Sequence, residues 1–110
     1  MTWFTSRELS VSYAAFVSHL LELFYSEHCF SCPEARQALR QFATSRSDVI
    51  VVERDVATEK ELELARRYRL IATPAIVIDG HEVMYGVPGA TALAARVDAS
   101  QPVTHLTGCD

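Results

Sequence analysis

Cysteine is scarce in this chain, which has three cysteines among its 110 residues. A small secreted domain stapled by disulfides normally needs a denser and even-numbered set, so this count argues against a disulfide scaffold. Basic residues are also few, with 10 Lys and Arg against 14 Asp and Glu, which gives a net charge of −4. Proteins that bind nucleic acid or an anionic membrane surface concentrate positive charge, so we expect neither as a partner.

Long apolar runs are missing as well, and none approaches the length of a membrane span. The first twenty residues contain Arg7, Glu8 and His19, which interrupt any signal-peptide core. A cytoplasmic location is therefore the expectation. Glycine and proline number only four each, which leaves long uninterrupted segments for regular structure. With 49% hydrophobic residues, a chain of this length can build a single core.

Between the few glycines and prolines, segments with the apolar pattern of a strand alternate with segments that have the pattern of a helix. Strands are predicted over residues 20–25, 49–53, 75–78 and 81–85, and helices from residue 29 to residue 43, from 58 onward and over 90–97. Asp79-Gly80 is a hairpin signal between the last two strands. The order β-α-β-α-β-β-α predicts an α/β fold, a mixed four-stranded sheet flanked by helices. Its β-branched strand 49–53 is expected to be central and parallel.

The two ends of the chain are predicted to lie outside this domain. Residues 1–19 form an N-terminal extension, residues 20–100 the domain and residues 101–110 a C-terminal tail. Two segments match the capping-box pattern that starts a helix, namely residues 5–8 and residues 58–61. After the first, apolar residues at helical spacing, up to Val17 and Leu20, favour a helix. An alternating strand through Leu9, Val11 and Tyr13 is the other interpretation.

Cys29 and Cys32 stand at i and i+3 where a helix is expected to begin. Residues so spaced have Cα atoms about 5 Å apart, which permits a disulfide. A disulfide that closes such a short loop constrains the unfolded chain little and so adds little stability. We therefore expect the bond to serve a reaction in which it is formed and broken. The helix N-terminus favours the thiolate of Cys29, and Cys32 should be more shielded. We expect Cys29 to attack a substrate disulfide and Cys32 to resolve the mixed disulfide.

Other uses of the pair fit the sequence less well. His28 could favour the thiolate when protonated, but an ordinary exposed histidine fits equally well. A zinc site would need two more ligands, for which His105 and Cys109 in the tail are the candidates. A phosphatase loop would need arginine where Ala35 stands. Haem attachment would need histidine where Pro33 stands. No metal or other cofactor is expected.

Thr73-Pro74 directly precedes the strand 75–78, a position at which proline is tolerated. A strand, Cys-x-x-Cys at a helix start, and Thr-Pro before a hairpin together resemble the thioredoxin/glutaredoxin family, over residues 20 to 97. The resemblance implies a thioredoxin-like fold in which Pro74 is cis and packs beside both cysteines. It also implies that Thr73 backbone groups pair with an extended substrate segment, near Phe30 and Ser31.

This sequence departs from the family pattern at two places. Thioredoxins carry a buried acid where Leu23 stands, and Glu22 should point to the other face of the sheet. Glutaredoxins hold glutathione with acidic residues after a glycine pair, but residues 86–91 contain no acid. A basic residue near the cysteines is also missing unless Arg36 reaches round, so glutathione is disfavoured as a tight partner.

The sequence therefore predicts a thiol–disulfide oxidoreductase that cycles the Cys29–Cys32 pair. Its substrates would be disulfide-containing proteins or small molecules, and an unidentified reductase or thiol pool would recharge it. A redox-sensing adaptor and a metal-binding module using the same cysteines are the alternatives.

Overall fold

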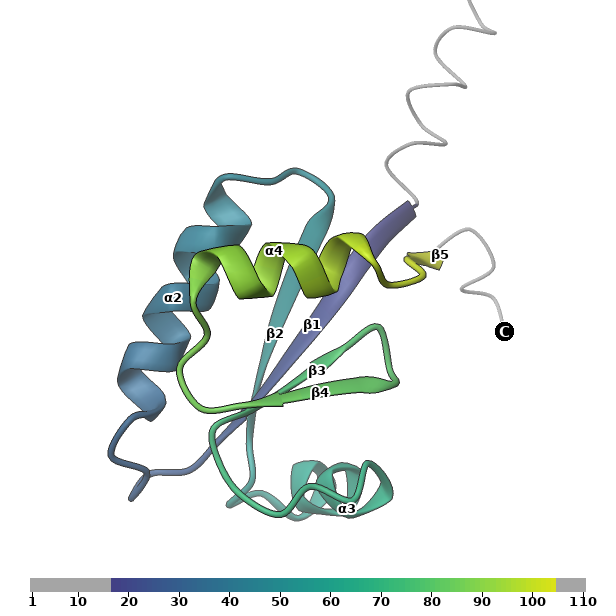
Figure 1. Cartoon of the computed structure of the whole chain (residues 1–110). Coiled ribbons are helices and arrows are strands. Elements are labelled where there is room, and N and C mark those ends of the chain that lie inside the picture. Colours follow the sequence, from purple (N-terminus) through teal and green to yellow (C-terminus); the bar gives the residue numbers. More distant parts are fainter. Residues whose placement is uncertain (1–16, 105–110) are drawn as a thin grey trace, which may run out of the picture.

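The computed structural model describes residues 17–104 of the chain (Figure 1). Its elements are β1 (Val17–Tyr25), α2 (Cys32–Thr44), β2 (Val49–Asp55), α3 (Glu59–Arg67), β3 (Ala75–Ile78), β4 (Glu82–Tyr85), α4 (Ala90–Asp98) and β5 (Val103–Thr104). The predicted order from β1 to α4 is confirmed. None of the helices in this part of the chain combines the length and apolar character needed to cross a bilayer.

The four main strands form a mixed sheet in the order β2-β1-β3-β4. Strand β1 runs parallel to β2 and antiparallel to β3, and β3 runs antiparallel to β4. The expectation that residues 49–53 form a central strand is wrong, because within residues 17–104 β2 pairs only with β1. A β-branched run indicates a strand, but its place in the sheet depends on pairing. Here β1 has a partner on each side.

Strand β1 begins at Val17, three residues earlier than expected. Val17 and Leu20, assigned to the end of an N-terminal helix, belong to the sheet because both have partners there: Val17 pairs with Thr104, and Leu20 with Ile50. The C-terminal segment also differs from the expected loose tail, since Val103–Thr104 form the short strand β5. Residues 1–16, with both interpretations of the extension, and residues 105–110 lie outside the described part.

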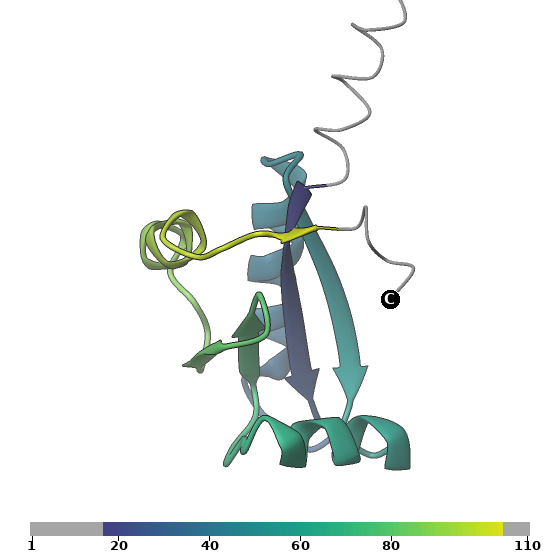
Figure 2. The same ribbon diagram turned by 90° about the vertical axis from the view of Figure 1, so that its right-hand side faces the viewer.

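Helices cover both faces of the sheet (Figures 1 and 2). On one face, α2 and α4 pack against inward side chains of β1 and β3 in a core that includes Leu21, Leu23, Leu39, Ile76, Leu93 and Val97. On the other face, α3 packs over a smaller core around Phe24, Ala65, Ala75 and Val77. This division follows from strand geometry, in which successive residues point to opposite faces.

The hairpin between β3 and β4 turns at Asp79 and Gly80, as the sequence predicts. Their φ angles are 51° and 84°, the left-handed values that a two-residue hairpin turn of type I′ requires. The His81 N–H donates to the Ile78 carbonyl at 3.2 Å. The buried Asp79 carboxylate accepts a hydrogen bond from the Leu20 N–H and bonds His19 Nδ1, each at 2.7 Å. The turn is thereby fastened to β1.

The predicted capping box at residues 58–61 does not form. Thr58 is the N-cap of α3, but its hydroxyl donates to the Asp55 carbonyl at 2.9 Å rather than capping the helix. The Asp55 carboxylate accepts from the Ala57 N–H at 2.9 Å. Glu61, the acid of the pattern, is instead bonded by Arg54 Nη1 at 3.1 Å. The bonds expected between Thr58 and Glu61 are therefore replaced by bonds of Asp55 at the start of the helix and of Arg54 to Glu61.

Candidate redox-active site

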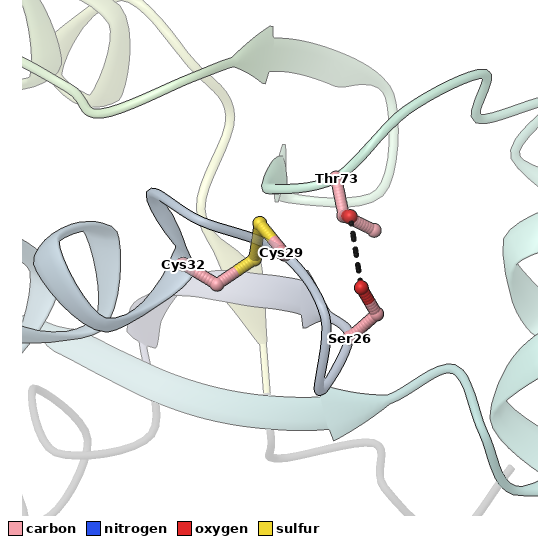
Figure 3. Close-up of a disulfide and its surroundings, with 4 residues drawn as sticks. All are labelled: Ser26, Cys29, Cys32 and Thr73. Atoms are coloured by element: carbon pink, nitrogen blue, oxygen red, sulfur yellow. Dashed lines mark hydrogen bonds between the residues drawn. A yellow bond between two sulfur atoms is a disulfide. The ribbon is translucent and has the colours of Figure 1, made fainter.

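A disulfide joins Cys29, in the loop between β1 and α2, to Cys32, the first residue of α2 (Figure 3). Their Cα atoms lie 5.3 Å apart, close to the separation that the spacing predicts. The two residues differ in exposure, because Cys29 is partly exposed whereas Cys32 is only 2% exposed. An incoming disulfide can therefore reach Cys29, and Cys32 is sheltered beneath it.

The helix starts later than the sequence predicts. Helix α2 begins at Cys32, so Cys29 precedes its first turn. A tight loop accounts for this: the Cys29 N–H donates to the Ser26 carbonyl at 3.3 Å, and the Cys32 N–H to the Cys29 carbonyl at 3.4 Å. Pro33 lies in the first helical turn, where its missing N–H leaves no bond unmade. Cys32, rather than Cys29, is therefore the first residue of the helix.

Thr73 lies on the segment that faces this loop (Figure 3), and Pro74 follows it in the chain. The Thr73–Pro74 peptide bond is cis, and Pro74 is buried. Thr73 Oγ1 and Ser26 Oγ form a hydrogen bond of 3.4 Å, which links the two segments. The Pro74 carbonyl accepts from the Gly86 N–H at 3.0 Å, so the end of the β3–β4 hairpin lies alongside. Segments far apart in sequence thus meet at the disulfide.

The other expected site residues lie around the pair with different exposure. His28 and Phe30 are exposed, and the Phe30 side chain is 100% exposed. Ser31 is half-buried and forms the N-cap of α2 without a side-chain cap bond. Phe30 therefore offers an apolar surface beside the reactive bond.

The strand before the site has no acid facing the cysteine side. Leu23 is fully buried in the core under α2 and α4. Glu22, also buried, faces α3, where it is bonded by Arg54 Nε at 3.0 Å and by the Tyr68 hydroxyl at 2.9 Å. Burial and this hydrogen bond raise the pKa of Tyr68 to about 12. The Glu22 carboxylate therefore forms its hydrogen bonds on the face of the sheet that α3 covers, and not on the face that α2 covers.

A hollow of about 280 Å³ opens beside the disulfide, lined by Tyr25, Ser26, Glu27, Cys29, Cys32, Pro33, Arg36 and Asp55. The sequence did not indicate Asp55 as a site residue, and it suggested Arg36 only as a basic residue that could reach the cysteines. Two signals could have found them. Arg36 stands four residues after Cys32 and so shares its helix face. Asp55 is the parallel-register partner of Tyr25 at the ends of β1 and β2.

Within residues 17–104, no three His, Cys, Asp or Glu side chains gather as a metal site would require. His105 and Cys109, the tail residues considered as zinc ligands, lie outside the described residues.

Comparison with known proteins gives the class of protein that this fold and site define. A family model described as a thioredoxin domain matches residues 21–97. A thioredoxin from Methanocaldococcus jannaschii is 32% identical over 77 residues, which cover 70% of this chain and 89% of that protein. The chain belongs to the thioredoxin family.

Solved structures agree on the fold. A mutant thioredoxin from Halobacterium salinarum superposes with a TM-score of 0.66 at 22% identity, covering 82% of this chain and 80% of that one. The oxidised mitochondrial thioredoxin 3 of Saccharomyces cerevisiae gives 0.64 at 22% identity, covering 84% and 90%. Family membership and the cysteine pair together support a thiol–disulfide oxidoreductase in general terms.

Proposed function

We propose that this chain exchanges disulfides through a mixed disulfide on Cys29. The Cys29 thiolate attacks one sulfur of a substrate disulfide, forms the mixed disulfide and releases the other substrate sulfur as a thiolate. The Cys32 thiolate then attacks Cys29 Sγ, which forms the Cys29–Cys32 disulfide and releases the second substrate thiolate. The substrate gains two electrons and the protein loses two. The observation that carries this proposal is the difference in exposure between Cys29 and the buried Cys32.

The substrate is proposed to bind along the segment before Pro74. Backbone groups of Thr73 would pair with an extended stretch of a protein substrate, as an added strand does at a sheet edge. Phe30, fully exposed, and Ser31, half-buried, would contact the substrate from the cysteine loop. His28 is exposed next to the nucleophile and would favour its thiolate when protonated. A small disulfide would react with Cys29 in the same way while making fewer contacts with these residues.

In a reducing compartment such as the cytoplasm the pair would act as a net reductant, recharged by a reductase or a thiol pool. Glutathione is not the favoured partner, because residues 86–91 offer no acidic side chain to hold its amino group.

Reduction of insulin disulfides with dithiothreitol as the reductant tests the proposal. We expect turnover by the intact protein and by Cys109→Ser, and loss of turnover in Cys29→Ser. Cys32→Ser should accumulate a mixed disulfide with a peptide disulfide, because nothing resolves it. Equal rates for the intact protein and Cys29→Ser would exclude the proposed oxidoreductase activity and favour a redox-sensing adaptor. Stoichiometric zinc on the freshly reduced protein would favour the metal-binding alternative.

A further inference from the structure

Helix α2 brings an arginine to the hollow beside the disulfide. Arg36 lies one helical turn after Cys32 and lines this hollow together with both cysteines. We infer that Arg36 is a positioning residue of the redox couple: its guanidinium stabilises the thiolate of the reduced pair and so sets how easily the disulfide is reduced. This deepens the proposed function, since it concerns the same two cysteines.

Two contacts hold Arg36 in place. Its Nε and Nη2 donate to Oε1 of Glu53 at 3.2 and 3.0 Å. Its guanidinium carbon lies 4.5 Å from the centre of the Tyr25 ring, within cation–π distance. The side chain is 34% exposed, so solvent screens it only in part. A planar guanidinium fixed by a carboxylate and an aromatic ring keeps one orientation, unlike a mobile surface cation.

Glu53 does not cancel this charge, because it serves two arginines. Arg40 Nε donates to Oε2 of Glu53 at 2.7 Å, and Arg40 Nη2 donates to Oε1 at 2.9 Å. Two guanidinium groups on one carboxylate leave an excess of one positive charge on this side of α2. Of the two, only Arg36 lines the hollow with the cysteines.

The other charges around the hollow oppose Arg36 weakly. Glu27 lines it but is exposed, so solvent and salt screen its carboxylate, and Glu34, near the cysteines in sequence, is exposed as well. His28 is also exposed and carries no negative charge. The Asp55 carboxylate also lines it but accepts the Ala57 N–H, which draws it toward the start of α3. The strand position at which thioredoxins carry a buried acid is occupied by Leu23, which has no carboxylate. Among the lining residues, the positive charge comes from Arg36.

The sign of the effect on the redox equilibrium follows. One protein disulfide and two glutathione thiols give one protein dithiol and one glutathione disulfide. A cation near the sulfurs favours the thiolate, lowers the pKa of the reactive thiol and stabilises the dithiol side. Without Arg36, the thiol pKa should rise and the pair should be harder to reduce.

The experiment compares Arg36→Met with Arg40→Met. Both variants remove one positive charge and one partner of Glu53, but only the first removes the charge beside the cysteines. In the reduced protein, thiolate absorbance titrated against pH gives the thiol pKa, and a glutathione redox buffer gives the equilibrium constant. We expect Arg36→Met to raise the pKa by about half a unit, the effect of losing one partly screened charge from the lining of the same hollow. Above that pKa, the equilibrium constant should fall about threefold. Arg40→Met should do less.

Two further variants separate charge from packing. Arg36→Lys keeps the charge and should restore most of the wild-type pKa. Glu53→Gln removes the shared carboxylate and should move the pKa in the opposite direction, downward. Equal shifts in Arg36→Met and Arg40→Met, or no shift in either, would overturn the inference. Neither measurement needs substrate turnover, so this result is independent of whether the protein reduces insulin.

Discussion

The hydroxyl groups of Ser26 and Thr73, 47 residues apart in sequence, lie 3.4 Å apart and join the cysteine loop to the segment before Pro74. Ser26 also accepts the Cys29 N–H through its carbonyl at 3.3 Å. One residue therefore contacts both the proposed nucleophile's backbone and the proposed substrate-binding segment. Together with the pairing of β1 and β3, this contact sets the relative position of the two halves of the site.

Removing this hydroxyl contact should have a small effect on stability and a larger one on substrate use. Ser26→Ala should lower the free energy of unfolding by about 0.5–1 kcal/mol, since the bond is long and partly buried. Urea unfolding measures that loss, and insulin reduction should show a higher KM because the Thr73 segment is less well placed. Ser47→Ala, at an exposed position, is the control. Identical KM values for the two variants would contradict the proposed role.

A second prediction concerns the turn residue Asp79. Its side chain is fully buried, bonds His19 and Leu20, and sits at a φ of 51°. Asp79→Ala should lower the free energy of unfolding by about 2 kcal/mol or more, because it leaves buried partners unpaired and strains the backbone. Asp79→Asn keeps an acceptor oxygen and tolerates this φ, so it should lose less. Urea unfolding of the two variants checks this, and equal losses would exclude the hydrogen bonds as the cause.

Acid should destabilise the protein partly through Glu53. Hydrogen bonds from Arg40, and then Arg36, hold the pKa of Glu53 below its usual value of 4.5, although burial opposes them. Because the folded-state pKa is depressed, the stabilisation is present above the unfolded-state pKa and is lost as pH falls through the folded-state value. Unfolding midpoints in urea, measured from neutral to acid pH, should therefore fall less steeply in Glu53→Gln. Glu59→Gln, exposed on α3, should retain the wild-type slope.

Alkali should reveal the buried phenol of Tyr68. Burial and the hydrogen bond to Glu22 raise its pKa to about 12 from the ordinary value of 10.0. Because the folded-state pKa is raised, the stabilisation is complete below pH 10 and is lost as pH rises through about 12. Absorbance titration of the tyrosines should show a late component near pH 12 that disappears in Tyr68→Phe. The component should persist in Tyr85→Phe, because residue Tyr85 is 46% exposed.

Features that depend on neighbouring residues could be predicted from the sequence. The spacing of Cys29 and Cys32 sets their Cα separation whatever the fold around them. Asp79-Gly80 sets the hairpin, because aspartate and glycine accept the left-handed φ that the turn needs. The apolar periodicity of Ala35 and Leu39 sets the buried face of α2. Together with Thr73-Pro74, these local patterns were enough for the fold and its family.

Tertiary structure decided the features that depend on distant partners. Among residues 17–104, strand β2 lies at an edge because β1 takes the place between β2 and β3, which the composition of residues 49–53 cannot reveal. Val17 is a strand residue because β5 pairs with it. Helix α2 starts at Cys32 rather than Cys29, since a turn from Ser26 occupies the residues between. For the two strands the competing states differ in long-range hydrogen bonds, whereas the start of α2 is set by bonds between residues three apart in sequence.

The charge at the site belongs to this second group. The sequence places Arg36 one turn after Cys32, but only the packing of α2 on β2 brings it onto Glu53 and Tyr25. The sequence by itself thus determined that a cysteine pair opens a helix in a thioredoxin-like fold. The tertiary structure decided which cation lies beside that pair, because the electrostatic environment of a thiol depends on side chains that meet only when the strands pair.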